Sequence, residues 1–176
     1  MAAISNIKLI GRDGNAAPIV LGVMVQEVDL SDKLSREAQH SGFVAVSWED
    51  ASGKEHIYRA SLPKELKYGR MFAYPSPDQN LLFVGHQNEK YESVNLILSP
   101  DGAIKTRLTV PARLSRNVHA VSDSTELNPV MSFHWVNNTK LMGVDFQIGH
   151  SDYHEQRYII LSTLEFETTE FEVQGW

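Results

Sequence analysis

Short runs in which apolar and polar residues alternate make up most of the chain, and turn residues separate each run from the next. The run Gly42-Phe-Val-Ala-Val-Ser-Trp48 alternates, turns at Asp50-Ala-Ser-Gly53 and returns through Glu55-His-Ile-Tyr-Arg59. This order of strand, turn and strand predicts a β-hairpin. Similar runs at residues 6–10 and 19–30 flank another turn. The strand pattern therefore begins near the N-terminus and continues along the chain.

Strand runs repeated at such short intervals predict a mainly β fold. We expect a single antiparallel β domain over residues 1–176, either a sandwich or a curved meander with blade-like hairpins, with about ten strands. One segment departs from this pattern. Residues 31–40 place Leu34 and Ala38 on one side at helical spacing and are followed by Gly42, a residue that commonly ends helices. The sequence predicts one short helix there.

The tripeptide Ser-Pro-Asp occurs twice, from Ser76 and from Ser99. Proline presets the backbone angle of the second turn position, and aspartate and glycine suit the next two, so both copies predict turns. Residues 73–110 combine this motif with a strand ending in Phe83-Val84, a polar loop, a second strand, an aspartate–glycine turn and a final strand. In this order they resemble one blade of the repeats that build TolB-type β-propellers.

The resemblance to a propeller blade covers about a fifth of the chain. A closed propeller takes at least about four blades, which this chain is too short to supply. The resemblance therefore implies a local antiparallel meander, and neither a propeller nor a propeller's function. Residues 131–173 repeat the strand pattern of residues 73–110 without the Ser-Pro-Asp motif.

Composition excludes several classes of chemistry. The 176 residues include no cysteine, which excludes disulfides, thiolate catalysis and thiolate zinc sites. The longest apolar run, Pro18-Ile-Val-Leu-Gly-Val-Met-Val25, is the length of a strand and too short to cross a membrane. The N-terminus shows no basic leader followed by an apolar core, so we expect a cytoplasmic protein without a membrane partner.

The net charge of −6 is concentrated near the C-terminus. Residues 150–176 hold six acids and one base, Arg157, so they account for −5 of that charge. An acidic chain of this kind is a poor binder of nucleic acid, because neutralising phosphates requires clustered lysine and arginine. We take the acids as a tentative surface for a basic protein partner. They are Asp152, Glu155, Glu165, Glu167, Glu170 and Glu172.

The run Leu164-Glu-Phe-Glu-Thr-Thr-Glu-Phe-Glu-Val173 changes phase in its middle. A bulge or turn at Thr168-Thr169 would let both halves bury their apolar residues while all four glutamates face water. Two interpretations remain open. Charge on an edge strand prevents sheets from aggregating, and an acidic face also attracts a basic partner.

The stretch Gly149-His-Ser-Asp-Tyr-His-Glu155 is the strongest candidate for a chemical site. Two histidines four residues apart could chelate a metal on a helix, but these lie between two strand-like runs and among turn residues. A hydrolytic zinc site would also need a third ligand, and no sequence feature brings His86, His119 or His134 near. We expect a solvated hairpin tip. We also expect His134 to be exposed or at the edge of the core, opposite Phe133.

Other catalytic signatures are missing from the sequence. No serine lies in a Gly-x-Ser-x-Gly elbow, and no glycine-rich loop precedes a helix as in phosphate-binding motifs. We therefore expect no catalytic residue, no metal and no cofactor. Six aromatic residues fall at alternating strand positions and are expected in the core, or else around a cavity for a small ligand, as in lipocalin-like barrels. They are Trp48, Phe83, Phe133, Trp135, Phe146 and Phe166.

A protein-binding module is the function that these features favour. Small size, acidic charge concentrated in one segment and the lack of a catalytic motif are typical of a cognate inhibitor or bacterial immunity protein. Such a protein would neutralise a basic partner, for example a toxin nuclease, by steric occlusion. The alternatives are a β barrel that binds a small molecule and an enzyme that uses histidine and carboxylate. The sequence does not indicate an oligomeric state.

Overall fold

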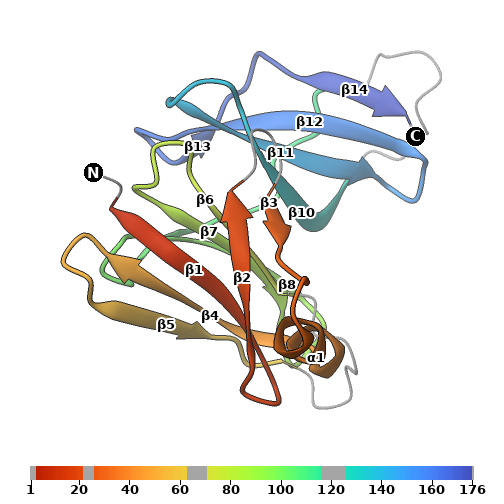
Figure 1. Cartoon of the computed structure of the whole chain (residues 1–176). Helices are drawn as coiled ribbons and strands as arrows, with labels where there is room; N and C mark the ends of the chain where they lie inside the picture. The colour runs from red at the N-terminus through yellow and green to blue at the C-terminus, as the bar shows by residue number, and fades with distance from the viewer. Residues whose placement is uncertain (1–2, 22–25, 63–70, 116–125, 176) are drawn as a thin grey trace. The chain divides into compact units, whose positions relative to one another are not determined.

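The computed structural model describes residues 3–21, 26–62, 71–115 and 126–175. Within these ranges the chain is mainly β, with three antiparallel sheets and one short helix, which confirms the predicted fold class (Figure 1). Two compact units are present, Met1–Leu108 and Thr109–Trp176, and each is described by itself below. The expectation of a single domain remains a prediction.

The first sheet contains the predicted hairpin over residues 42–59. Trp48 pairs with His56 across it, and the turn between them uses Gly53 at a φ of 82°, which favours glycine. The strand order is β3-β2-β1-β4-β5. The bounds are β1 Ile4–Gly11, β2 Ala16–Leu21, β3 Gln26–Val28, β4 Phe43–Asp50 and β5 Glu55–Arg59.

The helix, α1, spans Lys33–Ser41, close to the predicted residues 31–40. It starts late because Asp32 is its N-cap and accepts a hydrogen bond of 2.9 Å from the backbone N–H of Ser35. Ala38 is buried as expected. Leu34 lies on the same side by its helical spacing, yet it is 57% exposed, because the buried residues of α1 are Ser35 and Ala38. Leu34 and Ala38 are one turn apart, and α1 buries too narrow a stripe to cover both.

The second sheet of this unit is a meander in the order β6-β7-β8-β9. Both Ser-Pro-Asp turns share two hydrogen bonds. Gln79 N donates to Ser76 O at 2.8 Å, Gly102 N donates to Ser99 O at 2.9 Å, and each serine hydroxyl donates to the aspartate two residues later. The predicted blade-like meander is thus confirmed. The strands are β6 Phe72–Pro75, β7 Leu82–Gln87, β8 Ser93–Leu98 and β9 Ile104–Arg107.

These two sheets share one hydrophobic core. Trp48 of β4 is among its largest buried side chains, and its indole Nε1 donates to the Pro100 carbonyl oxygen at 2.8 Å, inside the second Ser-Pro-Asp turn. An indole N–H that is buried needs such a partner. The core draws on both sheets, for example through Ile4, Leu9, Val46, Leu82, Val84, Leu96 and Leu98.

The third sheet lies in residues 109–176. Strand β12 pairs with β11 on one side, and on its other side with both β13 and β14, each along a different part of its length (Figure 1). Phe133 and Phe146 are buried here, as expected, while Trp135 and Phe166 are half-buried. The strands are β10 Leu127–Trp135, β11 Leu141–Ile148, β12 Tyr153–Ile160, β13 Glu165–Phe166 and β14 Glu172–Gly175.

The first Ser-Pro-Asp turn offers a test of this hydrogen bonding. Ser76 is fully buried, and its Oγ accepts from Leu81 N at 3.1 Å, so Ser76→Ala leaves a buried donor without this partner. We expect a loss of about 1–3 kcal/mol in the free energy of unfolding. Ser99→Ala, in the less buried second copy, should cost less. Urea denaturation measures both, and equal losses would contradict the assigned role of burial.

Candidate functional site

The acidic C-terminal segment is broken in the middle, as its phase change predicts. Phe166 pairs with Ile159 in β13, Val173 pairs with Glu155 in β14, and residues 167–171 form the loop between the two strands. As a consequence, the apolar residues of both halves are half-buried, while acids of both halves are exposed. The exposed acids are Glu165, Glu170 and Glu172, which we call the acidic edge.

Glu167 has a structural part in the same segment. Its carboxylate accepts from Thr169 N and from the Thr169 hydroxyl, each at 2.7 Å, and from Glu170 N. The Glu170 N–H, the Thr169 hydroxyl and the Thr169 N–H together lower the pKa of Glu167 to about 2. Glu167 therefore holds the loop closed, and it is less exposed than the three acids of the acidic edge.

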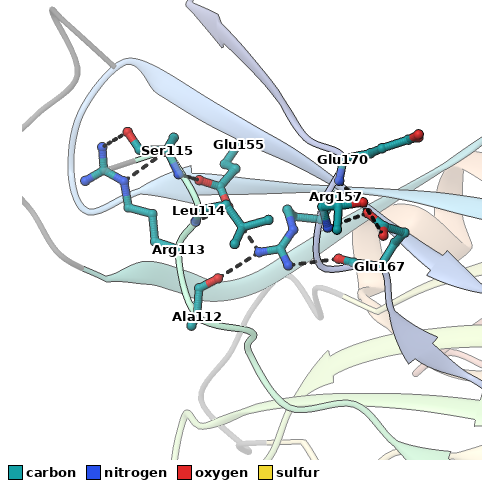
Figure 2. Close-up of polar contacts among 9 residues, drawn as sticks. Ala112, Arg113, Leu114, Ser115, Glu155, Arg157, Glu167 and Glu170 are labelled. Carbon is teal, nitrogen blue, oxygen red and sulfur yellow. Dashed lines mark hydrogen bonds and ion pairs between the residues drawn. The ribbon is translucent and has the colours of Figure 1, made fainter. Parts of the chain in front are cut away.

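Arg157 of β12 anchors this loop from beneath (Figure 2). Its guanidinium donates to Glu167 O at 3.1 Å and to Ala112 O at 2.8 Å, and it contacts Glu155 Oε1 at 3.1 Å. Arg157 is only 1% exposed, and its guanidinium carbon lies 6.0 Å from the centre of the Phe166 ring. One buried cation thus joins the start of the loop to the segment that precedes β10.

The position of Glu155 differs from the predicted one. It was predicted as part of the acidic partner-binding surface, yet it is 0% exposed and faces inward beside Arg157. Its carboxylate accepts from Leu114 N at 3.1 Å and from Ser115 N at 2.9 Å (Figure 2). The sequence did contain a signal: Glu155 has the same parity as Arg157 and Ile159, so all three point to one face of β12.

The histidine-containing stretch is a hairpin tip, as predicted. Residues 149–152 connect β11 and β12, and His150 and Asp152 are exposed there. His154 is half-buried in β12, opposite Gln147. The described residues contain no group of three or more histidine, aspartate or glutamate side chains able to hold a metal ion. His119, a candidate third ligand, lies outside the described residues.

His134 belongs to a polar network on the outer face of the third sheet that the sequence did not reveal. It is half-buried at the edge of the core, as predicted. Its Nδ1 lies 3.2 Å from Asp145 Oδ2 and its Nε2 lies 3.0 Å from Gln156 Nε2. Gly143 provides the space for the ring, because a Cβ on Gly143 would lie 2.0 Å from His134 Nε2. Only the strand register brings these residues together.

Comparison with known proteins supports the fold alone. A scan of known protein families finds no match, and neither does a search of curated proteins. One chain in the solved structure of Tne2 in complex with Tni2 is similar over 98% of this chain and 99% of its own, with a TM-score of 0.60 and 14% sequence identity. That chain was therefore solved within a complex of two proteins. No helix in the described ranges has the length and apolarity to cross a membrane.

The buried ion pair predicts a large effect on stability. Arg157→Met leaves the Glu155 carboxylate buried without its cation, which costs about 3–5 kcal/mol in the free energy of unfolding. Urea denaturation followed by circular dichroism measures the loss. The exposed Arg59 is the control, because Arg59→Met removes the same charge at the surface and should change stability by about 0.5 kcal/mol or less. Equal losses in the two variants would refute the anchoring role.

The lowered pKa of Glu167 predicts a pH dependence. Because the pKa is about 2 in the folded chain and 4.5 without these contacts, the stabilisation is complete above pH 4.5 and is lost as the pH falls toward 2. The melting temperatures of the parent and Glu167→Gln should therefore differ most near neutral pH and converge in that window. NMR titration of the Glu167 side-chain carboxyl gives the pKa directly. A midpoint near 4.5 would disprove the loop contacts.

Proposed function

We propose that this chain is a small acidic protein-binding module of the cognate-inhibitor, or immunity, type. It neutralises a basic partner protein, for example a toxin nuclease, by covering the partner's active surface. The chain itself performs no reaction in this mechanism. The observation that carries the proposal is the acidic edge, in which Glu165, Glu170 and Glu172 are exposed on both sides of an anchored loop.

The anchoring of the loop supports a binding role. Arg157 holds the backbone of Glu167, and the Glu167 carboxylate holds the backbone of Thr169 and Glu170. Acids held in place before binding lose less conformational entropy when a partner arrives than acids on a loose segment. Their charge raises the association rate and excludes acidic competitors, and both effects weaken as salt screens the charge.

The similarity to one chain of the Tne2–Tni2 structure is a second support, because it extends over almost all of both chains. At 14% identity it concerns the fold, and the identity of the partner is part of the proposal. The gene product encoded beside this chain's gene is the first partner to test, since cognate inhibitors need to be made together with their targets.

The test compares association rates of the parent and of the triple variant Glu165→Gln, Glu170→Gln, Glu172→Gln. Glu167 is kept, because its carboxylate holds the loop. At low ionic strength we expect the triple variant to associate on the order of tenfold more slowly with the neighbouring gene product. At high ionic strength the two rates should converge. Stopped-flow or surface-based kinetics measures both.

The matched control changes three exposed glutamates of the other unit, Glu27, Glu55 and Glu89, to glutamine. It removes the same net charge and should leave the association rate close to that of the parent. Equal slowing in both triple variants would assign the effect to net charge. An unchanged rate in both triple variants would mean that the acidic edge only protects a sheet edge from aggregation. Either result would overturn the proposed binding surface.

A further inference from the structure

The outer face of the third sheet has a hollow of about 220 Å³, which we call the outer hollow. It spans three neighbouring strands, since Asp145 lies in β11, His154 in β12, and Gln174 and Gly175 at the end of β14. A water molecule takes up roughly 30 Å³ in the liquid, so the outer hollow has room for a group of several heavy atoms.

Hydrogen bonds along this face set the chemistry of the outer hollow. Gln174 Nε2 donates to Gln156 Oε1 at 3.3 Å, which directs Gln156 Nε2 toward His134 Nε2 at 3.0 Å. The other ring nitrogen of His134, Nδ1, lies 3.2 Å from Asp145 Oδ2. Among the described residues, no lysine or arginine forms an ion pair with Asp145.

The carboxylates near the outer hollow make its surroundings negative. Burial raises the pKa of Tyr158, and the carboxylates of Glu172, Glu170 and Asp145 raise it further. Two of these three acids belong to the acidic edge, so the outer hollow and the acidic edge form one negative region. Among the described strand residues that alternate outward on β11, β12 and β14, none is lysine or arginine. They are Leu141, Gly143, Asp145, Gln147, His154, Gln156, Tyr158, Ile160, Glu172 and Gln174.

We propose that the outer hollow receives an arginine side chain of the basic partner protein. This inference rests on the proposed function and names the residue type that the partner inserts. The Asp145 carboxylate accepts from a guanidinium, and Gln174 Oε1 is a further acceptor because the Gln174 amide nitrogen is directed to Gln156. A planar guanidinium presents several N–H donors in a fork and so can pair with more than one acceptor.

Lysine fits this arrangement less well. Its ammonium is a compact and strongly hydrated charge that gives up more hydration on entering a hollow, and it lacks the planar fork. Asp145 and Gln174 lie on β11 and β14, the strands on either side of β12, so their acceptors approach the hollow from two sides. The arrangement therefore favours arginine over lysine.

The probe is Nα-acetyl-arginine amide, titrated into the full-length ¹⁵N-labelled chain at constant ionic strength. We expect saturable shifts centred on the backbone amides of Asp145, His154, Gln174 and Gly175. Asp145→Asn keeps the shape of the side chain and removes its charge, and it should weaken binding about tenfold. Glu89→Gln, which removes one exposed charge from the other unit, should bind as the parent does. Gln174→Ala, at an exposed position, is expected to weaken binding about threefold.

Two further probes separate charge from shape. The citrulline analogue has nearly the shape of arginine without its charge and should cause no shifts, and the lysine analogue should bind more weakly. Missing shifts with the arginine probe, an unchanged affinity in Asp145→Asn, or equal binding of the lysine probe would each overturn the inference. If Asp145→Asn also leaves partner association unchanged while the acidic-edge variant slows it, the inference fails and the proposed function stands. If arginine binds but no partner associates, the proposed function fails.

Discussion

Two opposite charges withdrawn from water, Glu155 and Arg157, determine how residues 109–176 are held together. A buried charge costs several kcal/mol unless an opposite charge and hydrogen bonds compensate it. Glu155 finds its partners in the backbone of Leu114 and Ser115, and Arg157 finds its partners in Ala112 and Glu167. The pair thus binds two segments, one on each side of β12 in the sequence, which have no strand contact with each other.

The two faces of strand β12 have different roles, because successive side chains point to opposite faces of the sheet. The inward residues Glu155 and Arg157 fasten the neighbouring segments, while the outward residues His154 and Gln156 contribute to the outer hollow and the polar network around it. Anchoring and the proposed recognition are therefore coupled through the register of one strand. A slip of one residue would expose the ion pair and bury the polar network at the same time.

Local features of the fold could be predicted from the sequence, because each depends on residues that are close together in the chain. The hairpin over residues 42–59, the two Ser-Pro-Asp turns and the break at Thr168-Thr169 all belong to this group. The inward position of Glu155 was not predicted. Its charge placed it among the surface acids, although its spacing from Ile159 along the strand indicates the buried face. The contact of His134 with Asp145 could not be predicted, since it depends on which residues of β10 pair with which residues of β11.

Strands β13 and β14 lie along the same side of β12, each with its own pairing. After Glu167, whose carbonyl oxygen Arg157 holds, residues 168–171 connect them. The length of this connection does not determine the register of either strand. Related chains could therefore lengthen, shorten or exchange the loop while the sheet beneath it stays the same. If related chains bind different partners, these four residues are a place where the surface can change while the sheet keeps its fold.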